Sequence, residues 1–362
     1  MAFQFISFGI WGQEKDSSVS HASHPNIFSI AAGVHRGFIF AHSPAVENTS
    51  GAHPTGIEVS LGWQKSDSAT WEICNCYPNK GLLVAYYDYD TRILGKGVLL
   101  AYFLEPNYRL SKKILFFIRG NVGLAYLTNP FDSVKNPTNQ SYSGAINGYL
   151  FFGIGLWFQP SKHWSLNGSL NYQHVSNGGL SLPNKGINWP TAGISIKYQK
   201  DSRAYYTGIR IKDKSWKKNP VRWNIALFGI AKKGTDARGR KKRLPLVGLN
   251  FQGGKQVGRI NMLTLGTEVF YDESLRMQLK RDSINASAAK VGLSFGHAFI
   301  LGKFLFSQRL GVYLLDQTPY YDQLYHRWGI DYSINKHWGL GMNLLAHRQV
   351  ADFIDIRFSY SL

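Results

Sequence analysis

Apolar and polar side chains alternate along many segments of this chain with a period of two residues. In the segment 354–362, polar residues separate the apolar ones, which are Ile354, Ile356, Phe358, Tyr360 and Leu362. Neighbouring side chains of a β-strand point to opposite faces, so such a strand is apolar on one face and polar on the other. In a soluble sandwich the apolar face would meet a core. In an outer-membrane barrel it would meet lipid, and the polar face would line the interior.

The length of these segments favours the membrane barrel. They run over about 10 to 15 residues, whereas a soluble strand usually has about five or six. We therefore predict an all-β fold, a transmembrane antiparallel β-barrel of about 14–16 strands, with 29–199 and 200–362 as its two halves. The expected strands are 29–42, 55–65, 80–89, 94–104, 113–127, 144–159, 163–176, 190–199, 220–231, 244–254, 257–271, 286–298, 302–315, 324–334, 338–348 and 352–362.

Hydropathy excludes a bundle of membrane helices. The mean hydropathy is −0.21, and no run of 18 apolar residues occurs. The first residues, 1–13, resemble the apolar centre of a signal peptide, although the basic region that should precede it is missing. We expect 1–13 to be a truncated signal peptide rather than a buried first segment, and 14–28 to be an N-terminal segment before the barrel.

The chain is strongly basic, with 41 Lys+Arg against 22 Asp+Glu and a net charge of +19. Such a balance points to a polyanion, which could be nucleic acid, anionic headgroups or a phosphorylated glycolipid. No nucleic-acid-binding motif is present, so we expect no nucleic-acid partner. The segment 232–243 holds seven Lys/Arg. It is either a solvated turn or a phosphate-binding clamp, whose members would be Arg238, Arg240, Lys241, Lys242 and Arg243.

The two cysteines, Cys74 and Cys76, are separated by one residue. That spacing makes a bridge improbable, so we expect two ordinary thiols beside a loop. Two thiols alone do not make a metal site, and we expect neither a metal nor an organic cofactor.

One stretch, 172–188, carries the residues of an esterase site. His174 and Ser176 are two apart on an expected strand and therefore project from the same face. Trp164, Leu166 and Tyr172 share that parity, so the pair belongs to the row expected to face lipid. An unsatisfied polar group there costs about 1–3 kcal/mol, unless the pair lies at the interfacial end of the strand, where water satisfies it.

The string H-x-S-N-G-G-x4-N-x-G, residues 174–186, resembles the active-site signature of the outer-membrane lipid A 3-O-deacylases of the PagL type. The upstream segment 129–147 resembles the corresponding part of the larger relatives known as acyloxyacyl hydrolases. The resemblance covers roughly 30–200. It implies that 29–199 is similar to the eight-stranded barrel of that family, and that 200–362 is the extension found in the larger relatives.

Carried over to this chain, the resemblance makes Ser176 the nucleophile and His174 its general base. Asn184 matches the asparagine associated with the oxyanion hole. Backbone N–H groups of Asn177, Gly178 or Gly179 are further candidate donors, unless these glycines serve only the hairpin.

The third position of the catalytic triad departs from the founding members of the family, which have a glutamate fourteen residues after the histidine, where this sequence has Asn188. Three readings stay open: Asn188 orients the histidine, another strand supplies a carboxylate, or the site is weak or inactive.

The expected function is that of a bacterial outer-membrane serine esterase that removes an ester-linked (3-O) acyl chain from lipid A of lipopolysaccharide. Its partners would be lipid A and the bilayer, and it would be a monomer or a weak homodimer. The alternative is a non-catalytic outer-membrane barrel, porin-like or structural, with a vestigial site. A sixteen-stranded barrel is wide enough to hold water.

Overall fold

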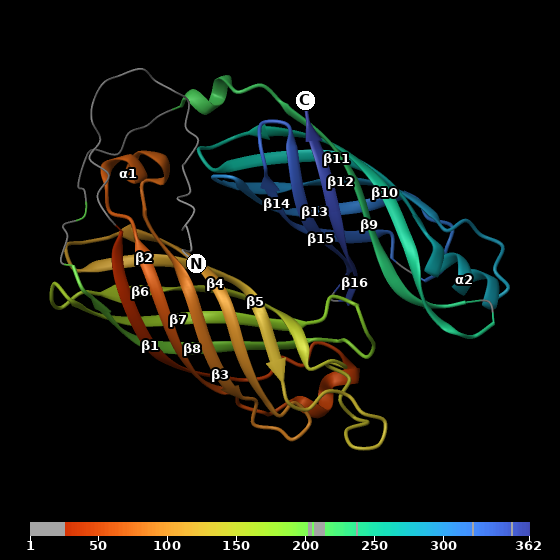
Figure 1. Cartoon of the computed structure of the whole chain (residues 1–362), viewed down its shortest axis with the longest axis horizontal. Helices are drawn as coiled ribbons and strands as arrows, with labels where there is room; N and C mark the ends of the chain where they lie inside the picture. Colours follow the sequence, from red (N-terminus) through yellow and green to blue (C-terminus); the bar gives the residue numbers. More distant parts are fainter. Residues whose placement is uncertain (1–25, 202–204, 206–213, 237, 321, 349) are drawn as a thin grey trace, which may run out of the picture. The chain divides into compact units, whose positions relative to one another are not determined.

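The computed structural model describes residues 26–362, apart from 202–204, 206–213, 237, 321 and 349. The expected signal peptide, 1–13, and nearly all of the segment 14–28 lie outside the described residues. The described strands form two closed antiparallel barrels of consecutive strands, β1 to β8 and β9 to β16 (Figure 1). No helix among the described residues has the length and hydropathy needed to cross a membrane.

The N-terminal barrel closes where β8 pairs with β1, with Ser29 opposite Gln199 and Gly37 opposite Thr191. Its strands are β1 (Ile27–Gly37), β2 (Thr55–Gln64), β3 (Tyr77–Asp88), β4 (Lys96–Arg109), β5 (Ile114–Leu127), β6 (Ile146–Phe158), β7 (Trp164–Ser176) and β8 (Ile187–Gln199). A 3-10 helix, η1 (Pro44–Thr49), lies between β1 and β2, and a short helix, α1 (Ser68–Cys74), lies between β2 and β3.

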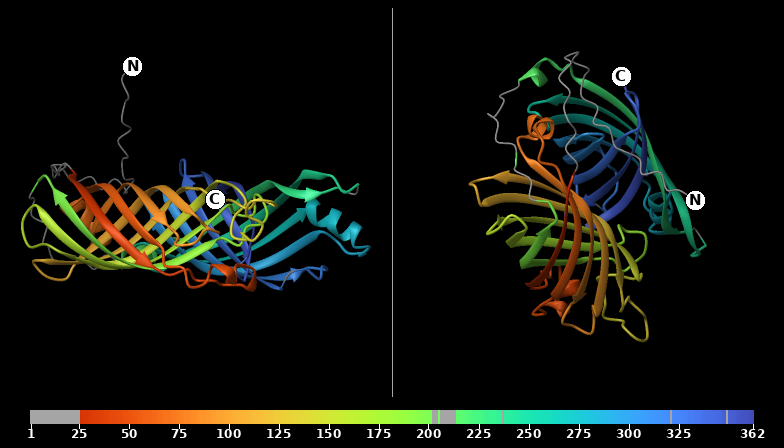
Figure 2. Two further views of the ribbon diagram at one scale, coloured as in Figure 1. Left: turned by 90° about the horizontal axis from the view of Figure 1, so that it is seen from below. Right: turned by 60° about the vertical axis from the view of Figure 1, so that its left-hand side comes forward.

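The C-terminal barrel closes where β16 pairs with β9, with Ile356 opposite Gly229. Its strands are β9 (Arg222–Thr235), β10 (Lys241–Gln256), β11 (Asn261–Asp272), β12 (Ala289–Leu301), β13 (Phe304–Leu315), β14 (Leu324–Ser333), β15 (Trp338–His347) and β16 (Val350–Ser361). A 3-10 helix, η2 (Ser215–Lys218), precedes β9, and α2 (Glu273–Arg281) connects β11 to β12. In both barrels each strand lies beside its sequence neighbours (Figure 2).

The all-β antiparallel class and the strand number are confirmed, but the chain closes twice rather than as one cylinder of sixteen strands. Alternation indicates which residues form a strand and which way they point. It does not indicate which strand completes the ring, because that depends on pairing between residues far apart in sequence. The two barrels are joined by the stretch 200–219, which lies between the expected strands 190–199 and 220–231.

The exterior of the N-terminal barrel is apolar, as the alternation predicted. Along β7 the exposed side chains include Trp164, Leu166 and Leu170, while Ser165, Asn167, Asn171 and Gln173 point inward. The interior is filled rather than open. Trp189 is fully buried and packs against Tyr87, Tyr89 and Tyr149.

Buried charges fill the interior of the C-terminal barrel. The guanidinium of Arg327 lies 3.1 Å from a carboxylate oxygen of Glu268 and also pairs with Asp355. Arg357 bonds to the same Asp355 at 2.7 Å. All of these side chains are at most 3% exposed, so their charges are compensated by one another rather than by water.

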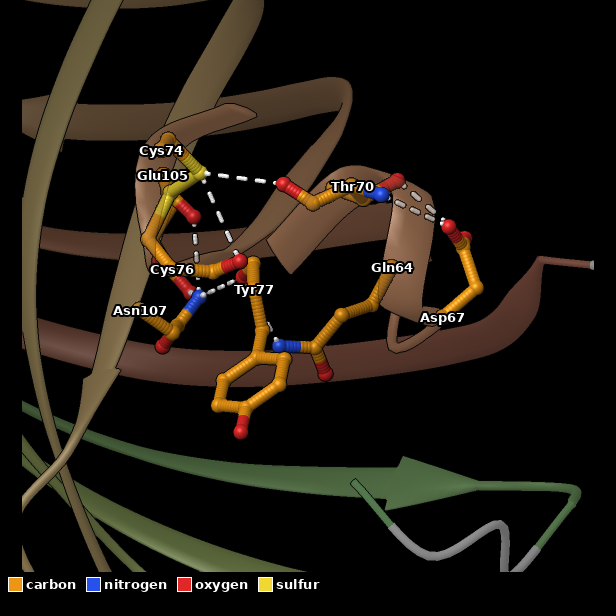
Figure 3. Close-up of a disulfide and its surroundings, with 8 residues drawn as sticks. All are labelled: Gln64, Asp67, Thr70, Cys74, Cys76, Tyr77, Glu105 and Asn107. Atoms are coloured by element: carbon orange, nitrogen blue, oxygen red, sulfur yellow. Dashed lines mark hydrogen bonds between the residues drawn. A yellow bond between two sulfur atoms is a disulfide. The ribbon is translucent and has the colours of Figure 1, made fainter. Parts of the chain in front are cut away.

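The expectation that Cys74 and Cys76 are free thiols is wrong, because they form a disulfide (Figure 3). The residue between them, Asn75, ends α1 in the left-handed conformation with φ 51°. This turn reverses the chain and leaves the two Cα atoms 5.1 Å apart, within the usual range for a bridge. Asparagine tolerates that conformation better than most residues do, and the Cys spacing alone does not report it.

Replacing Arg327 with glutamine should destabilise the C-terminal barrel, because Glu268 and Asp355 lose a buried partner. We expect a loss of about 3 kcal/mol in the free energy of unfolding, measured by denaturant unfolding in detergent micelles. The matched control is Arg348→Gln, which breaks the exposed pair with Asp322 and should cost less than about 1 kcal/mol. Equal losses in the two variants would contradict this account of the interior.

Candidate active site

His174 and Ser176 lie among the last three residues of β7 and face the outside of the N-terminal barrel. Both share parity with Leu170 and Tyr172, which are 65% and 43% exposed. The intervening residue, Val175, is fully buried in the interior. Because strand geometry fixes this alternation, the pair faces the surroundings of the barrel and not its interior.

The histidine is held by Asn188, which stands directly opposite it on β8. Nδ1 of His174 lies 2.7 Å from Oδ1 of Asn188. A carbonyl oxygen only accepts hydrogen bonds, so Nδ1 carries the proton and Nε2 keeps a lone pair. Among the described residues, no carboxylate bonds to this imidazole. The third position of the site is therefore occupied by an amide.

Ser176 and the imidazole of His174 both lie close to Gly186. A Cβ placed on Gly186 would stand 2.8 Å from Cε1 of His174 and 3.5 Å from Cβ of Ser176. Gly186 also has φ +78°, which favours glycine. In the described structure, Ser176 Oγ accepts a bond from the N–H of Gly178 at 3.4 Å and is not bonded to His174. Catalytic hydrogen bonds are commonly loose before substrate binds.

The N–H donors of the loop after Ser176 are mostly bonded within the protein. The Asn177 N–H is used, because it donates to Oδ1 of Asn184 at 3.0 Å. That bond leaves Nδ2 of Asn184 buried and, among the described residues, without a partner. The N–H of Gly179 is also used, by Oδ1 of Asn177. The Gly178 N–H is bonded to Ser176 Oγ, so of the candidate oxyanion donors only Nδ2 of Asn184 is left without a partner among the described residues.

The loop between β5 and β6 supports the site. The N–H of Gly186 donates to the carbonyl of Ser141 at 2.7 Å, and Ser143 Oγ donates to Ser181 Oγ at 2.8 Å. Asn139 in turn bonds to the carbonyl of Asn129 at 2.7 Å. The upstream segment singled out in the sequence therefore shapes the loops around the site and contributes no reacting group.

Tyr142, in the same loop, makes a further hydrogen bond that holds the loop in place. Burial raises the pKa of the Tyr142 hydroxyl, so it stays protonated and donates to the carbonyl of Leu94 at 2.7 Å.

Two features of the site escaped the sequence analysis. His42 lies beside Asn188, with 2.9 Å between His42 Nδ1 and Asn188 Nδ2. His42 has the same parity as the exposed Phe38 and Phe40. The alternation therefore indicated that the His42 side chain points outward, but it did not indicate that its partner is Asn188. Gly148 faces Ser176 across the β6–β7 pairing.

The basic segment belongs to the other barrel, where it forms the β9–β10 hairpin. Its candidate phosphate ligands Arg238, Arg240, Lys241, Lys242 and Arg243 are exposed. Asp236 lies 3.0 Å from Arg240 and 3.5 Å from Lys242. Backbone donation from Arg240 lowers the pKa of Asp236, which keeps this carboxylate charged within the hairpin. A phosphate-binding role of the hairpin stays a prediction.

Two family models match the chain. One, described as lipid A 3-O-deacylase (PagL), matches residues 55–198, and the other, described as the C-terminal domain of acyloxyacyl hydrolase, matches residues 221–362. Together they span nearly all strands of both barrels. No curated protein matches the chain.

Three of the solved structures that match this chain cover about half of it. Neisserial surface protein A is 9% identical, with 48% of this chain and 96% of that one covered, at a TM-score of 0.35. The outer-membrane enzyme PagL is 19% identical, with 46% and 97% covered, at 0.34. Ail of Yersinia pestis is 12% identical, with 49% and 99% covered, at 0.28.

The Asn188 contact makes a prediction about the tautomer of His174. Nitrogen NMR of the folded, unprotonated imidazole should show the proton on Nδ1. Asn188→Leu removes the acceptor, so the share of the Nε2–H form should grow. His163 provides the control, because its Nδ1 bonds to the backbone carbonyl of Gln199 at 2.9 Å and should not respond. A proton on Nε2 of His174 in the unmodified protein would contradict the assignment.

Proposed function

Because this chain belongs to the PagL family of outer-membrane lipid A deacylases, we propose that it hydrolyses the 3-O ester of lipid A with Ser176 as nucleophile. The observation that carries the proposal is the outward-facing pair of His174 and Ser176, with Nδ1 of His174 bonded to Asn188. A site that faces lipid suits a substrate that is itself a component of the membrane.

The reaction uses groups of this barrel alone. Ser176 Oγ attacks the ester carbonyl while Nε2 of His174 takes the hydroxyl proton. The negative charge on the carbonyl oxygen is stabilised by hydrogen bonds that the Asn184 NH2 group donates and that the Gly178 N–H donates once it leaves Ser176 Oγ. Collapse expels the sugar-bound alkoxide, which takes the proton from His174. A water molecule, deprotonated by His174, then attacks the carbonyl of the acyl-serine. The bond to Ser176 Oγ breaks, the fatty acid is released, and the imidazolium of His174 returns the proton to Ser176 Oγ.

Asn188 supplies one of the two effects that a carboxylate would have on His174. It holds the imidazole in the tautomer whose Nε2 accepts a proton, but it brings no charge to stabilise the imidazolium that forms. We therefore propose an active enzyme whose chemical step is slower than it would be with a carboxylate at this position.

The substrate approaches Ser176 over β6. Gly148 stands opposite Ser176 and presents no side chain, so the carbonyl has room beside the hydroxyl. On either side along the outer row, Ile146 and Leu150 are 68% and 47% exposed. We propose that these apolar side chains accommodate the acyl chain while the ester lies over Gly148.

Three further points concern phosphate binding, the oligomeric state and the porin-like alternative. We propose that the exposed Arg and Lys of the β9–β10 hairpin bind glycolipid phosphates, since Arg pairs bidentately with phosphate oxygens. We propose a monomer or weak homodimer, because all of the reacting groups belong to one barrel. The porin-like alternative is disfavoured by the aromatic packing that fills this barrel.

Replacing Ser176 with alanine should abolish deacylation by at least about a thousandfold, because the nucleophile is lost. The measurement is mass spectrometry of lipid A after incubation with purified protein or from expressing cells. The control is Ser169→Ala on the same strand, whose hydroxyl faces the interior side and bonds to Gly193. Equal release of the acyl chain by Ser176→Ala and the unmodified protein would defeat the proposal.

Replacing Gly148 with leucine should lower the deacylation rate at least about tenfold by filling the space beside Ser176. The new side chain faces lipid, but its Cβ would stand 3.3 Å from the carbonyl oxygen of Ser176. Gly148→Ala therefore measures the effect of the Cβ alone, and folding is checked by the heat-dependent gel shift. Gly168→Leu is the matched control: it lies on the same outer surface, and a Cβ there meets nothing within 4 Å. If both variants keep full activity, the ester does not lie over Gly148.

A further inference from the structure

The chain beyond β1 is tied to β8 and brings His42 to the site. The N–H of Phe38 donates to the carbonyl of Pro190 at 3.3 Å, and the N–H of Phe40 donates to that of Asn188 at 2.8 Å. Two residues further, the His42 ring meets the Asn188 side chain, with 2.9 Å between His42 Nδ1 and Asn188 Nδ2. An amide nitrogen only donates, so Nδ1 of His42 is the acceptor.

The Asn188 amide is thereby bonded at both ends. Its oxygen accepts from His174 and its nitrogen donates to His42. A half-turn of the amide would exchange oxygen and nitrogen with almost no change in shape. The nitrogen would then face His174 Nδ1, which would have to accept, and the imidazole proton would move to Nε2. An imidazole with its proton on Nε2 cannot take the proton of Ser176.

We propose that His42 is a positioning residue, which fixes the Asn188 amide and through it the active tautomer of His174. This inference rests on the proposed function. A residue with this role is needed because position 188 carries an amide and not a carboxylate. The two oxygens of a carboxylate are equivalent, so a carboxylate at position 188 presents an acceptor to His174 in either orientation. An asparagine does so in only one, and His42 holds that orientation as long as its own Nδ1 is unprotonated and accepts from Nδ2 of Asn188.

The test compares substitutions of His42 in two backgrounds, Asn188 and Asn188→Asp, by deacylation of lipid A vesicles and by nitrogen NMR of His174. In the Asn188 background, His42→Leu removes the acceptor and should lower kcat at least about tenfold with little change in KM. His42→Asn places an amide oxygen near the position of Nδ1 and should restore most of kcat. In the leucine variant the His174 proton should shift toward Nε2.

In the Asn188→Asp background, the same His42→Leu substitution should cost less than about a third of that factor, because the carboxylate needs no orientation. Phe38→Leu serves as the control, since that side chain is 50% exposed and lies four residues before His42 on the same segment. Folding of each variant is checked by the heat-dependent gel shift of intact barrels.

Each outcome distinguishes the two proposals. If Ser176→Ala retains activity, the proposed function fails and the role of His42 fails with it. If activity depends on Ser176 but His42→Leu keeps the full kcat, only the role of His42 is overturned. An equal loss from His42→Leu in both backgrounds, or a His174 tautomer that does not respond, makes His42 a merely structural residue and also overturns the inference.

Discussion

Closure of the hydrogen-bonded ring is the constraint on which the rest of the structure depends. In hydrocarbon an unpaired backbone N–H or C=O costs several kcal/mol, so a sheet that spans a membrane must return to its own first strand. Here β8 returns to β1, and the chain then builds a second ring from β9. The seam between β8 and β1 also brings the chain beyond β1 along β8, which sets His42 beside Asn188.

Local features of the fold and site could be predicted from the sequence. The expected strand 163–176 differs from β7 by one residue, and His174 and Ser176 face outward as their parity predicted. Both depend on side-chain direction, which spacing along one strand determines. Other features could not be predicted in this way. The disulfide on either side of Asn75 depends on the conformation of a turn. The closure into two rings and the contact between His42 and Asn188 depend on pairing between segments that are distant in the sequence. Alternation carries no information about these.

An amide in place of a carboxylate changes what the site must provide. A carboxylate orients an imidazole and also stabilises its charge, whereas an amide orients it only when the amide is itself oriented. Asn188 is bonded on both sides, to His174 and to His42, so the geometry is retained while the charge is not. Asn184 is held in a comparable way, because its side-chain oxygen accepts from the Asn177 N–H, while its Nδ2 is buried and, among the described residues, has no partner.

The outward direction of the site determines how an enzyme of this kind would meet its substrate. A lipid would reach Ser176 by lateral diffusion within the leaflet, so the barrel would not need to open or carry anything through its filled interior. Turnover would follow the mole fraction of substrate in the surface rather than its bulk concentration. Inert lipids would then act as a two-dimensional diluent, and the released fatty acid would remain in the same bilayer.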